Sequence, residues 1–170
     1  MLLANSIEAD EILMTPDKNL AQYAAANTRK KIHLWEGHCP FHNNLTVQDV
    51  AAAKSAHPEA LFIAHPECPP PILELADSIQ STSGMIRFAG ESDRDQFILG
   101  TETGLIYPIS KAHPNKKFFP ASDKMYCVDM KKITLAHVLD SLENLTGTIK
   151  LPEDIRVAAL GSVQKMIDMK

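Results

Sequence analysis

Two short segments of the chain each place side chains that could do chemistry close together in the sequence. The first reads GHCPFH from residue 37 and separates Cys39 from His42 by two residues; the second reads HPEC from residue 65. His65 and Glu67 lie two apart, so at a strand end they point to the same side and suit a general acid–base pair. Each segment is also consistent with a plain loop, in which the cysteine is partly buried or prolines stiffen the turn.

Two different metal sites can be drawn from these residues. Cys39 and His42 together with His65 and Cys68 form a two-cysteine, two-histidine set that suits structural zinc. Alternatively, Cys39 and Cys127 are ligands of an iron–sulfur cluster, with Cys68 or a residue from elsewhere as the third. Cys127 lies about one α/β repeat beyond Cys39, and equivalent positions in a pseudo-symmetric assembly can face one centre. Spacing alone does not choose between the two sites.

Hydroxyl and glycine residues form two further clusters. Ser81 and Thr82 precede an expected helix, where their hydroxyls and nearby N–H groups suit either a bound phosphate or carboxylate or ordinary helix caps. Gly100 opens the segment GTETGL, a two-glycine loop after an apolar run, which is a weak signal by itself.

The elements that must position these clusters alternate between strand and helix. Thr46 and Asp49 have the spacing of a capping box at the start of one helix. Apolar runs predict strands at Glu11–Thr15, Lys31–Trp35, Ala60–Ala64, Gln96–Gly100 and Lys117–Pro120. Helical spacing, caps and prolines predict helices from Pro16 to Ala26, from Thr46 to near His57, over Pro70–Ala76, over Thr134–Asn144 and from Pro152 onward. The alternation predicts an α/β fold with a mainly parallel sheet, whose carboxyl edge would collect the polar clusters on one active face.

The composition excludes several classes of protein. A chain of 170 residues with 45% hydrophobic residues and a net charge of −4 is globular and has no basic surface for nucleic acid. Its apolar runs are too short to span a membrane, and its first residues do not resemble a secretory signal. With only three cysteines, we expect reduced thiols and a cytoplasmic protein rather than a disulfide framework.

Six motifs, in order, resemble those of the quinolinate synthase family of bacterial NAD-biosynthesis enzymes. They are PDKNL from residue 16, GHCPFH from 37, HPEC from 65, STSGM from 81, GTETGL from 100 and CVDMKK from 127. The resemblance implies three-layer α/β/α repeats with parallel sheets, arranged threefold around one [4Fe-4S] cluster with three cysteine ligands. It also implies a transferase that condenses iminoaspartate with dihydroxyacetone phosphate, releasing phosphate and water to give quinolinate.

The resemblance assigns the candidate site residues. Cys39 and Cys127 match two cluster ligands, whereas Cys68 matches a cysteine that is not a ligand, which favours the cluster over zinc. Glu67 matches the proton-transfer residue and His65 its substrate-binding partner. The remaining matches are His42 as a catalytic residue of the pocket, and Ser81 and Thr82 as donors to a substrate carboxylate or phosphate.

The chain also departs from the family pattern. Gln80, Asp129 and Tyr107 stand where the family usually has glycine, asparagine and histidine, and Ala4-Asn5 resembles the remnant of an upstream motif. The first repeat and most of the second, with the third cluster cysteine, have no counterpart. We therefore expect residues 1–38 to be the end of the second repeat, 39–126 the third repeat, and 127–170 a helical segment that closes the assembly.

Three hypotheses follow from this incomplete match. In the first, a second polypeptide supplies the missing repeats and completes the enzyme. In the second, the chain is a truncated α/β module without activity of its own, and in the third it is a small zinc-stabilised binding domain. Because the family shares apolar interfaces among its repeats, we also expect an isolated chain to expose apolar surface and to self-associate.

Overall fold

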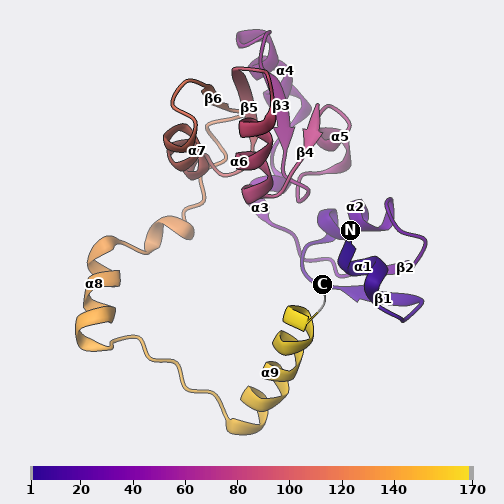
Figure 1. The fold of residues 1–170 in the computed structure, drawn as a ribbon, viewed down its shortest axis with the longest axis vertical. Coiled ribbons are helices and arrows are strands. Elements are labelled where there is room, and N and C mark those ends of the chain that lie inside the picture. Colours follow the sequence, from indigo (N-terminus) through magenta and orange to yellow (C-terminus); the bar gives the residue numbers. More distant parts are fainter. Residues whose placement is uncertain (1, 169–170) are drawn as a thin grey trace. The chain divides into compact units, whose positions relative to one another are not determined.

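The computed structural model describes residues 2–168 and divides into two compact units. One unit spans Ala9–Cys127 and contains every strand of the described chain; the other combines the residues before Ala9 with those after Cys127. Figure 1 shows both units and the labels of their elements.

The larger unit contains two parallel sheets. Strands β1 (Glu11–Met14) and β2 (Lys31–Leu34) form the first, and helix α2 (Lys18–Ala25) connects them. The second sheet has the order β4-β3-β5-β6, and all its neighbouring pairs are parallel. Its strands are β3 (Leu61–Ala64), β4 (Ser78–Ile79), β5 (Gln96–Gly100) and β6 (Lys117–Pro120). The α/β class with parallel sheets predicted from the sequence is therefore confirmed.

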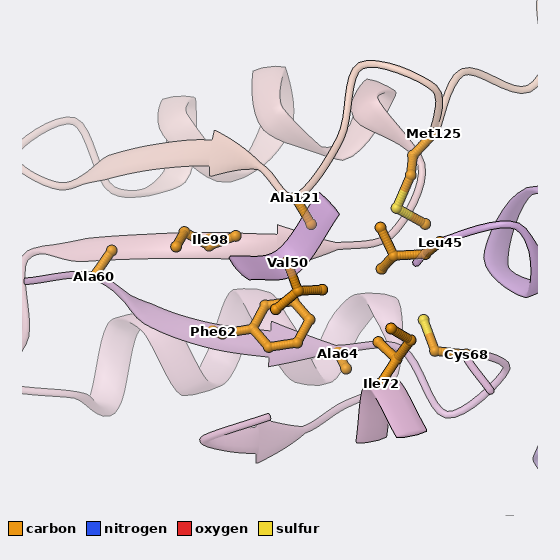
Figure 2. Packing of buried hydrophobic residues seen from close by; sticks show 10 residues of the cluster. All are labelled: Leu45, Val50, Ala60, Phe62, Ala64, Cys68, Ile72, Ile98, Ala121 and Met125. Carbon is orange, nitrogen blue, oxygen red and sulfur yellow. The ribbon is translucent and has the colours of Figure 1, made fainter. Parts of the chain in front are cut away.

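Helices cover both faces of the four-stranded sheet. The helices of this unit that follow β2 are α3 (Pro40–Asn43), α4 (Val47–Ala56), α5 (Pro70–Leu73), α6 (Thr82–Glu91), the short 3-10 helix η1 (Thr103–Leu105) and α7 (Ile106–Ala112). On one face, Phe62 of β3 packs with Val50 of α4 and Ile72 of α5 (Figure 2). On the other, Phe97 of β5 packs with Met85 of α6, in the same cluster as residues of α7. These contacts make three layers, α/β/α.

Alternation along the central strands explains why their sequences are almost wholly apolar. In β3, Phe62 and Ala64 lie in one buried cluster and Ile63 in the other; in β5, Ile98 belongs to the first cluster and Phe97 to the second. A strand buried on both faces has no position at which a polar residue meets solvent. The runs ALFIA and QFILG are therefore recognisable as central strands from sequence alone.

The predicted capping box at the start of α4 is confirmed. The Thr46 side chain accepts a hydrogen bond from the backbone of Asp49, and the Asp49 carboxylate accepts one from the backbone of Thr46. Hydrogen bonds from Thr46, and to a smaller extent the nearby Lys124, lower the pKa of the Asp49 carboxylate below the ordinary value. The start of α4 is thus fixed by residues next to it in sequence.

Residues 128–168 form the second unit together with the short helix α1 (Leu2–Ser6). Its elements are the 3-10 helix η2 (Met130–Lys132) and the helices α8 (Leu135–Asn144) and α9 (Glu153–Asp168). The apolar residues of α8 recur at helical spacing and form one stripe, yet their side chains are exposed; Leu135 is 89% and Leu142 75% accessible. Within residues 2–168, no helix combines the length and the apolar content needed to cross a bilayer.

Gly100 sits where a side chain has no room, which gives a first prediction. A Cβ atom there would lie 2.9 Å from Cε2 of the fully buried Phe62 and 3.3 Å from the backbone of Ala64. We expect Gly100→Ala to lower the free energy of unfolding by about 1–3 kcal/mol, measured by urea denaturation with far-UV circular dichroism.

Gly161 of α9 is the matched control for this change. A Cβ atom added there has no neighbour within 4 Å. Gly161→Ala should therefore leave stability unchanged or raise it by about 0.5–1 kcal/mol, because alanine favours the helix. Equal stabilities of the Gly100→Ala variant and the unmodified chain would contradict the packing argument.

Candidate functional site

The polar clusters that follow β2, β3 and β5 meet around the side chain of His42. His42 is buried on α3, the helix that Cys39 caps and Pro40 begins. Its Nδ1 atom lies 3.1 Å from Oε2 of Glu67, in the loop after β3. Its Nε2 atom lies 3.0 Å from Oγ1 of Thr101, directly after β5. The shared face predicted from the positions of these clusters is therefore present.

Cys39 belongs to the same group. Its Sγ atom lies 3.3 Å from Nδ1 of His42, and its thiol is partly exposed. Sγ of Cys39, a ring nitrogen of His42 and a carboxylate oxygen of Glu67 all lie within 4.8 Å of one another. Within residues 2–168, this is the one group of three histidine, cysteine or acidic side chains close enough to share a metal ion.

His65 and Glu67 have different charge states at neutral pH. Burial, helped by the neighbouring His42, lowers the pKa of His65 to about 4, so its imidazole is neutral. The hydrogen bond from His42 lowers the pKa of Glu67 and outweighs the opposing effect of burial, so its carboxylate is ionised. The rings of His42 and His65 stack with centroids 4.5 Å apart. The site therefore offers a carboxylate that can accept a proton beside two imidazoles.

Two residues of the first motif, Asp17 and Asn19, position this group. The buried Asp17 carboxylate caps α2 through one oxygen and accepts the backbone N–H of Cys39 through the other. The buried Asn19 amide donates to the backbone oxygen of Glu67 (3.0 Å) and to Oδ1 of Asn43 (3.1 Å). Sequence reasoning missed both roles, although an aspartate just before a helix is the usual sign of a cap.

Cys127 reaches the same edge of the sheet through the loop after β5. Its backbone N–H donates to Oε1 of Glu102, whose Oε2 accepts the N–H of Gly104. The preceding residue, Thr101, is the one that contacts His42. The segment GTETGL, weak as a sequence signal, thus touches both the Cys39–His42 loop and the Cys127 segment, and the roles of Thr101 and Glu102 were not predicted.

Cys68 faces the hydrophobic core instead of the site. It is fully buried beside Leu45, Ile72 and Met125 (Figure 2), and its thiol donates to the backbone oxygen of Gly100. Burial raises the pKa of the Cys68 thiol to about 12, which disfavours the thiolate that zinc would need. The burial of Cys68 therefore argues against the zinc ligand set of Cys39, His42, His65 and Cys68 considered from the sequence.

Ser81 and Thr82 lie at the carboxyl end of β4, which pairs with β3. Both side chains are exposed, and Ser81 caps α6 by accepting a hydrogen bond from the backbone of Gly84. The backbone N–H of Gln80 bonds to the oxygen of Ala64, so this segment runs beside the start of the His65 loop. The capping interpretation of Ser81 is confirmed, and the binding of a carboxylate or phosphate stays a prediction.

Asn19→Ala tests whether the buried amide holds the Glu67 loop. Its loss leaves the backbone oxygen of Glu67 and the side chain of Asn43 without their donor. An unsatisfied buried acceptor costs about 1–3 kcal/mol, so we expect that decrease in the free energy of unfolding.

The control for this variant is Asn27→Ala. The exposed amide of Asn27 donates to the backbone oxygen of Tyr23, four residues earlier in the chain. Asn27→Ala should change stability by less than about 0.5 kcal/mol. If the two variants were equally stable in urea denaturation, Asn19 would not be a positioning residue.

Comparison with known proteins confirms the resemblance predicted from the motifs. A sequence model of the family described as quinolinate synthetase A protein matches residues 1–168. Quinolinate synthase 1 of Methanosarcina acetivorans is 46% identical over 168 residues, which are 99% of this chain and 55% of that protein. Quinolinate synthase of Thermodesulfovibrio yellowstonii is 42% identical over 168 residues, which are 98% of this chain and 55% of that protein. The chain thus spans about half the length of these relatives, and it belongs to the quinolinate synthetase A family.

Proposed function

We propose that this chain carries the proton-transfer and substrate-binding part of a quinolinate synthase, which condenses iminoaspartate with dihydroxyacetone phosphate. The observation that carries the proposal is the ionised Glu67 between His42 and the neutral His65, at the carboxyl edge of a parallel sheet. Forming the pyridine ring requires protons to be removed from carbon and nitrogen, and a half-buried carboxylate beside imidazoles suits that task.

Each residue has a separate role in the proposed reaction. Glu67 accepts a proton from the bound substrate, and His42, 3.1 Å away, stabilises the carboxylate by a hydrogen bond. His65 is neutral and so can bind a substrate hydroxyl or carboxylate without forming a fixed ion pair with it. Ser81 and Thr82, exposed beside the His65 loop, would donate hydroxyl hydrogen bonds to a carboxylate or phosphate.

Cys39 and Cys127 are suited to hold two irons of a [4Fe-4S] cluster. Both thiols are partly exposed, and both segments contact the loop after β5, whereas Cys68 is buried in the core. A cluster bound by three cysteines would supply an open iron as a Lewis acid for a substrate hydroxyl or carboxylate. The third cysteine comes from outside these 170 residues, and such an oxygen-sensitive cofactor is consistent with a cytoplasmic protein.

Anaerobic reconstitution with iron and sulfide, in the presence of the unmatched part of the Methanosarcina acetivorans enzyme, tests this proposal. We expect broad visible absorbance and quinolinate formation from the mixture and neither activity nor a stable cluster from the chain alone. Cys39→Ala and Cys127→Ala should both abolish the absorbance, whereas the buried Cys68→Ala should retain it. Retention in either of the first two variants would contradict the ligand assignment.

The exposed stripe of α8 leads to a prediction about partners. Leu135, Val138, Leu139, Leu142 and Leu145 are all exposed. We propose that a second polypeptide, or in its absence another copy of the chain, covers this stripe. Light scattering should show concentration-dependent association of the chain alone. Leu139→Lys should reduce it and the off-stripe control Ala136→Lys should not; a strictly monomeric unmodified chain would refute the prediction.

A further inference from the structure

The group of Cys39, His42 and Glu67 has the composition of a mononuclear metal site. It offers one thiolate, one imidazole and one carboxylate, the three side-chain types that bind zinc. The ligand atoms come from the cap of α3, from α3 itself and from the loop after β3, so the fold brings them together from two separate segments of the chain. They differ from the four-residue zinc set in replacing His65 and the buried Cys68 with Glu67.

Two of the three separations between the ligand atoms are close to those that a tetrahedral ion imposes. Bond lengths of about 2.3 Å to sulfur and about 2.1 Å to nitrogen and oxygen place tetrahedral ligands roughly 3.4–3.6 Å apart. Nδ1 of His42 lies 3.3 Å from Sγ of Cys39 and 3.1 Å from Oε2 of Glu67. Sγ of Cys39 and a carboxylate oxygen of Glu67 lie within 4.8 Å of each other, so side-chain rotation would have to bring this third pair closer to admit the ion.

Hydrogen bonds to neighbouring residues hold these ligands in the orientation that metal binding requires. A histidine that binds a metal through one nitrogen usually donates its other N–H to a protein oxygen. Nε2 of His42 lies 3.0 Å from Oγ1 of the buried Thr101, which leaves Nδ1 directed at Cys39 and Glu67. The Asp17 carboxylate fixes the backbone of Cys39, and Asn19 fixes that of Glu67.

We propose that, when the chain holds no iron–sulfur cluster, Cys39, His42 and Glu67 bind one Zn²⁺ ion, with water at the fourth position. This site uses Glu67 and His42 and does not use Cys127. The Zn²⁺ ion would be bound by Cys39, a proposed cluster ligand, and by Glu67, the proposed proton acceptor. Binding of zinc and binding of the cluster therefore exclude each other. Zinc would then hold the site in an inactive form until the cluster is assembled.

Cobalt titration of the chelator-treated full chain, under anaerobic conditions, tests the proposal directly. One equivalent of Co²⁺ should bind and produce visible d–d absorption and a near-ultraviolet thiolate band. Zn²⁺ should displace the Co²⁺ and abolish both bands. Cys39→Ser should remove the thiolate band, and His42→Ala and Glu67→Gln should each weaken binding by at least about tenfold. Cys127→Ser is the matched cysteine control and should bind Co²⁺ and Zn²⁺ like the unmodified chain.

A pair of variants at Thr101 separates a built site from adventitious binding. Thr101→Val removes the hydroxyl beside His42 and should weaken Zn²⁺ binding about 10–100-fold, whereas Thr101→Ser should retain it. Circular dichroism verifies that each variant is folded. Retention of the thiolate band in Cys39→Ser, its loss in Cys127→Ser, or equal affinities of the two Thr101 variants would overturn the proposal. These readouts require neither cluster nor activity, so they fail independently of the proposed function.

Discussion

Glu67→Gln is expected to lower the turnover of the reconstituted enzyme by about 10²–10⁴-fold, the usual contribution of a positioned general base. Glutamine keeps the size of the side chain and can still contact His42, but it cannot accept a proton. Because the carboxylate is ionised in the structure, its proton-accepting form predominates at neutral pH. The loss should therefore appear mainly in kcat, with a smaller change in KM.

The measurement uses the mixture of this chain with the unmatched part of the Methanosarcina acetivorans enzyme, after anaerobic reconstitution. Glu91→Gln, at the exposed end of α6, is the matched control and should retain full activity. Equal cluster absorbance in all samples shows that a lost rate reflects proton transfer. A Glu67→Gln enzyme with unchanged kcat would remove Glu67 from the proposed mechanism.

The central strands were predictable because their signal is local. Residues 61–64 and 97–100 are apolar runs, and each is buried on both faces. Strand β4 was missed because Ser78–Ile79 is defined only by its pairing with β3. Helix α7 was also missed: Pro108 within it masks the helical pattern, although proline is tolerated in a first turn.

The site shows the same division between local and distant information. The chemical groups Cys39, His65 and Glu67 were identified from their types and spacing. The residues that position them act across the sequence: Asn19 contacts Glu67 from 48 residues away, and Thr101 contacts His42 from 59 residues away. Such contacts depend on the sheet that brings the loops together, and a single sequence does not encode them as a pattern.

Helix α8 illustrates a different limit. Its apolar spacing predicts the helix correctly, and the structure begins it directly after Thr134, which caps it. An apolar stripe predicts that a surface will be covered, yet it carries no information on what covers it. In the described chain the stripe is exposed, and the interpretation of α8 as a closing element stays a prediction.

Phe62→Ala should cause the largest loss of stability among the core variants. Phe62 is fully buried on β3, where it packs in one cluster with Val50 of α4 and Ile98 of β5 (Figure 2). Truncation removes most of a buried ring and leaves a cavity that close neighbours cannot fill, at a cost of about 3–5 kcal/mol. Because domains are commonly stable by about 5–15 kcal/mol, this is a large fraction of the total.

Urea denaturation followed by far-UV circular dichroism measures this loss, with two variants that calibrate it. Phe62→Leu retains most of the volume and should lose about 1.5 kcal/mol or less, so it reports on the site even if Phe62→Ala does not fold. Tyr107→Ala removes an aromatic ring that is 72% exposed and should change stability by less than about 0.5 kcal/mol. Similar losses for Phe62→Ala and Tyr107→Ala would show that the cluster around β3 does not hold the sheet and its helices together. The edge that carries His65 and Glu67 depends on that cluster, because both residues follow β3 directly.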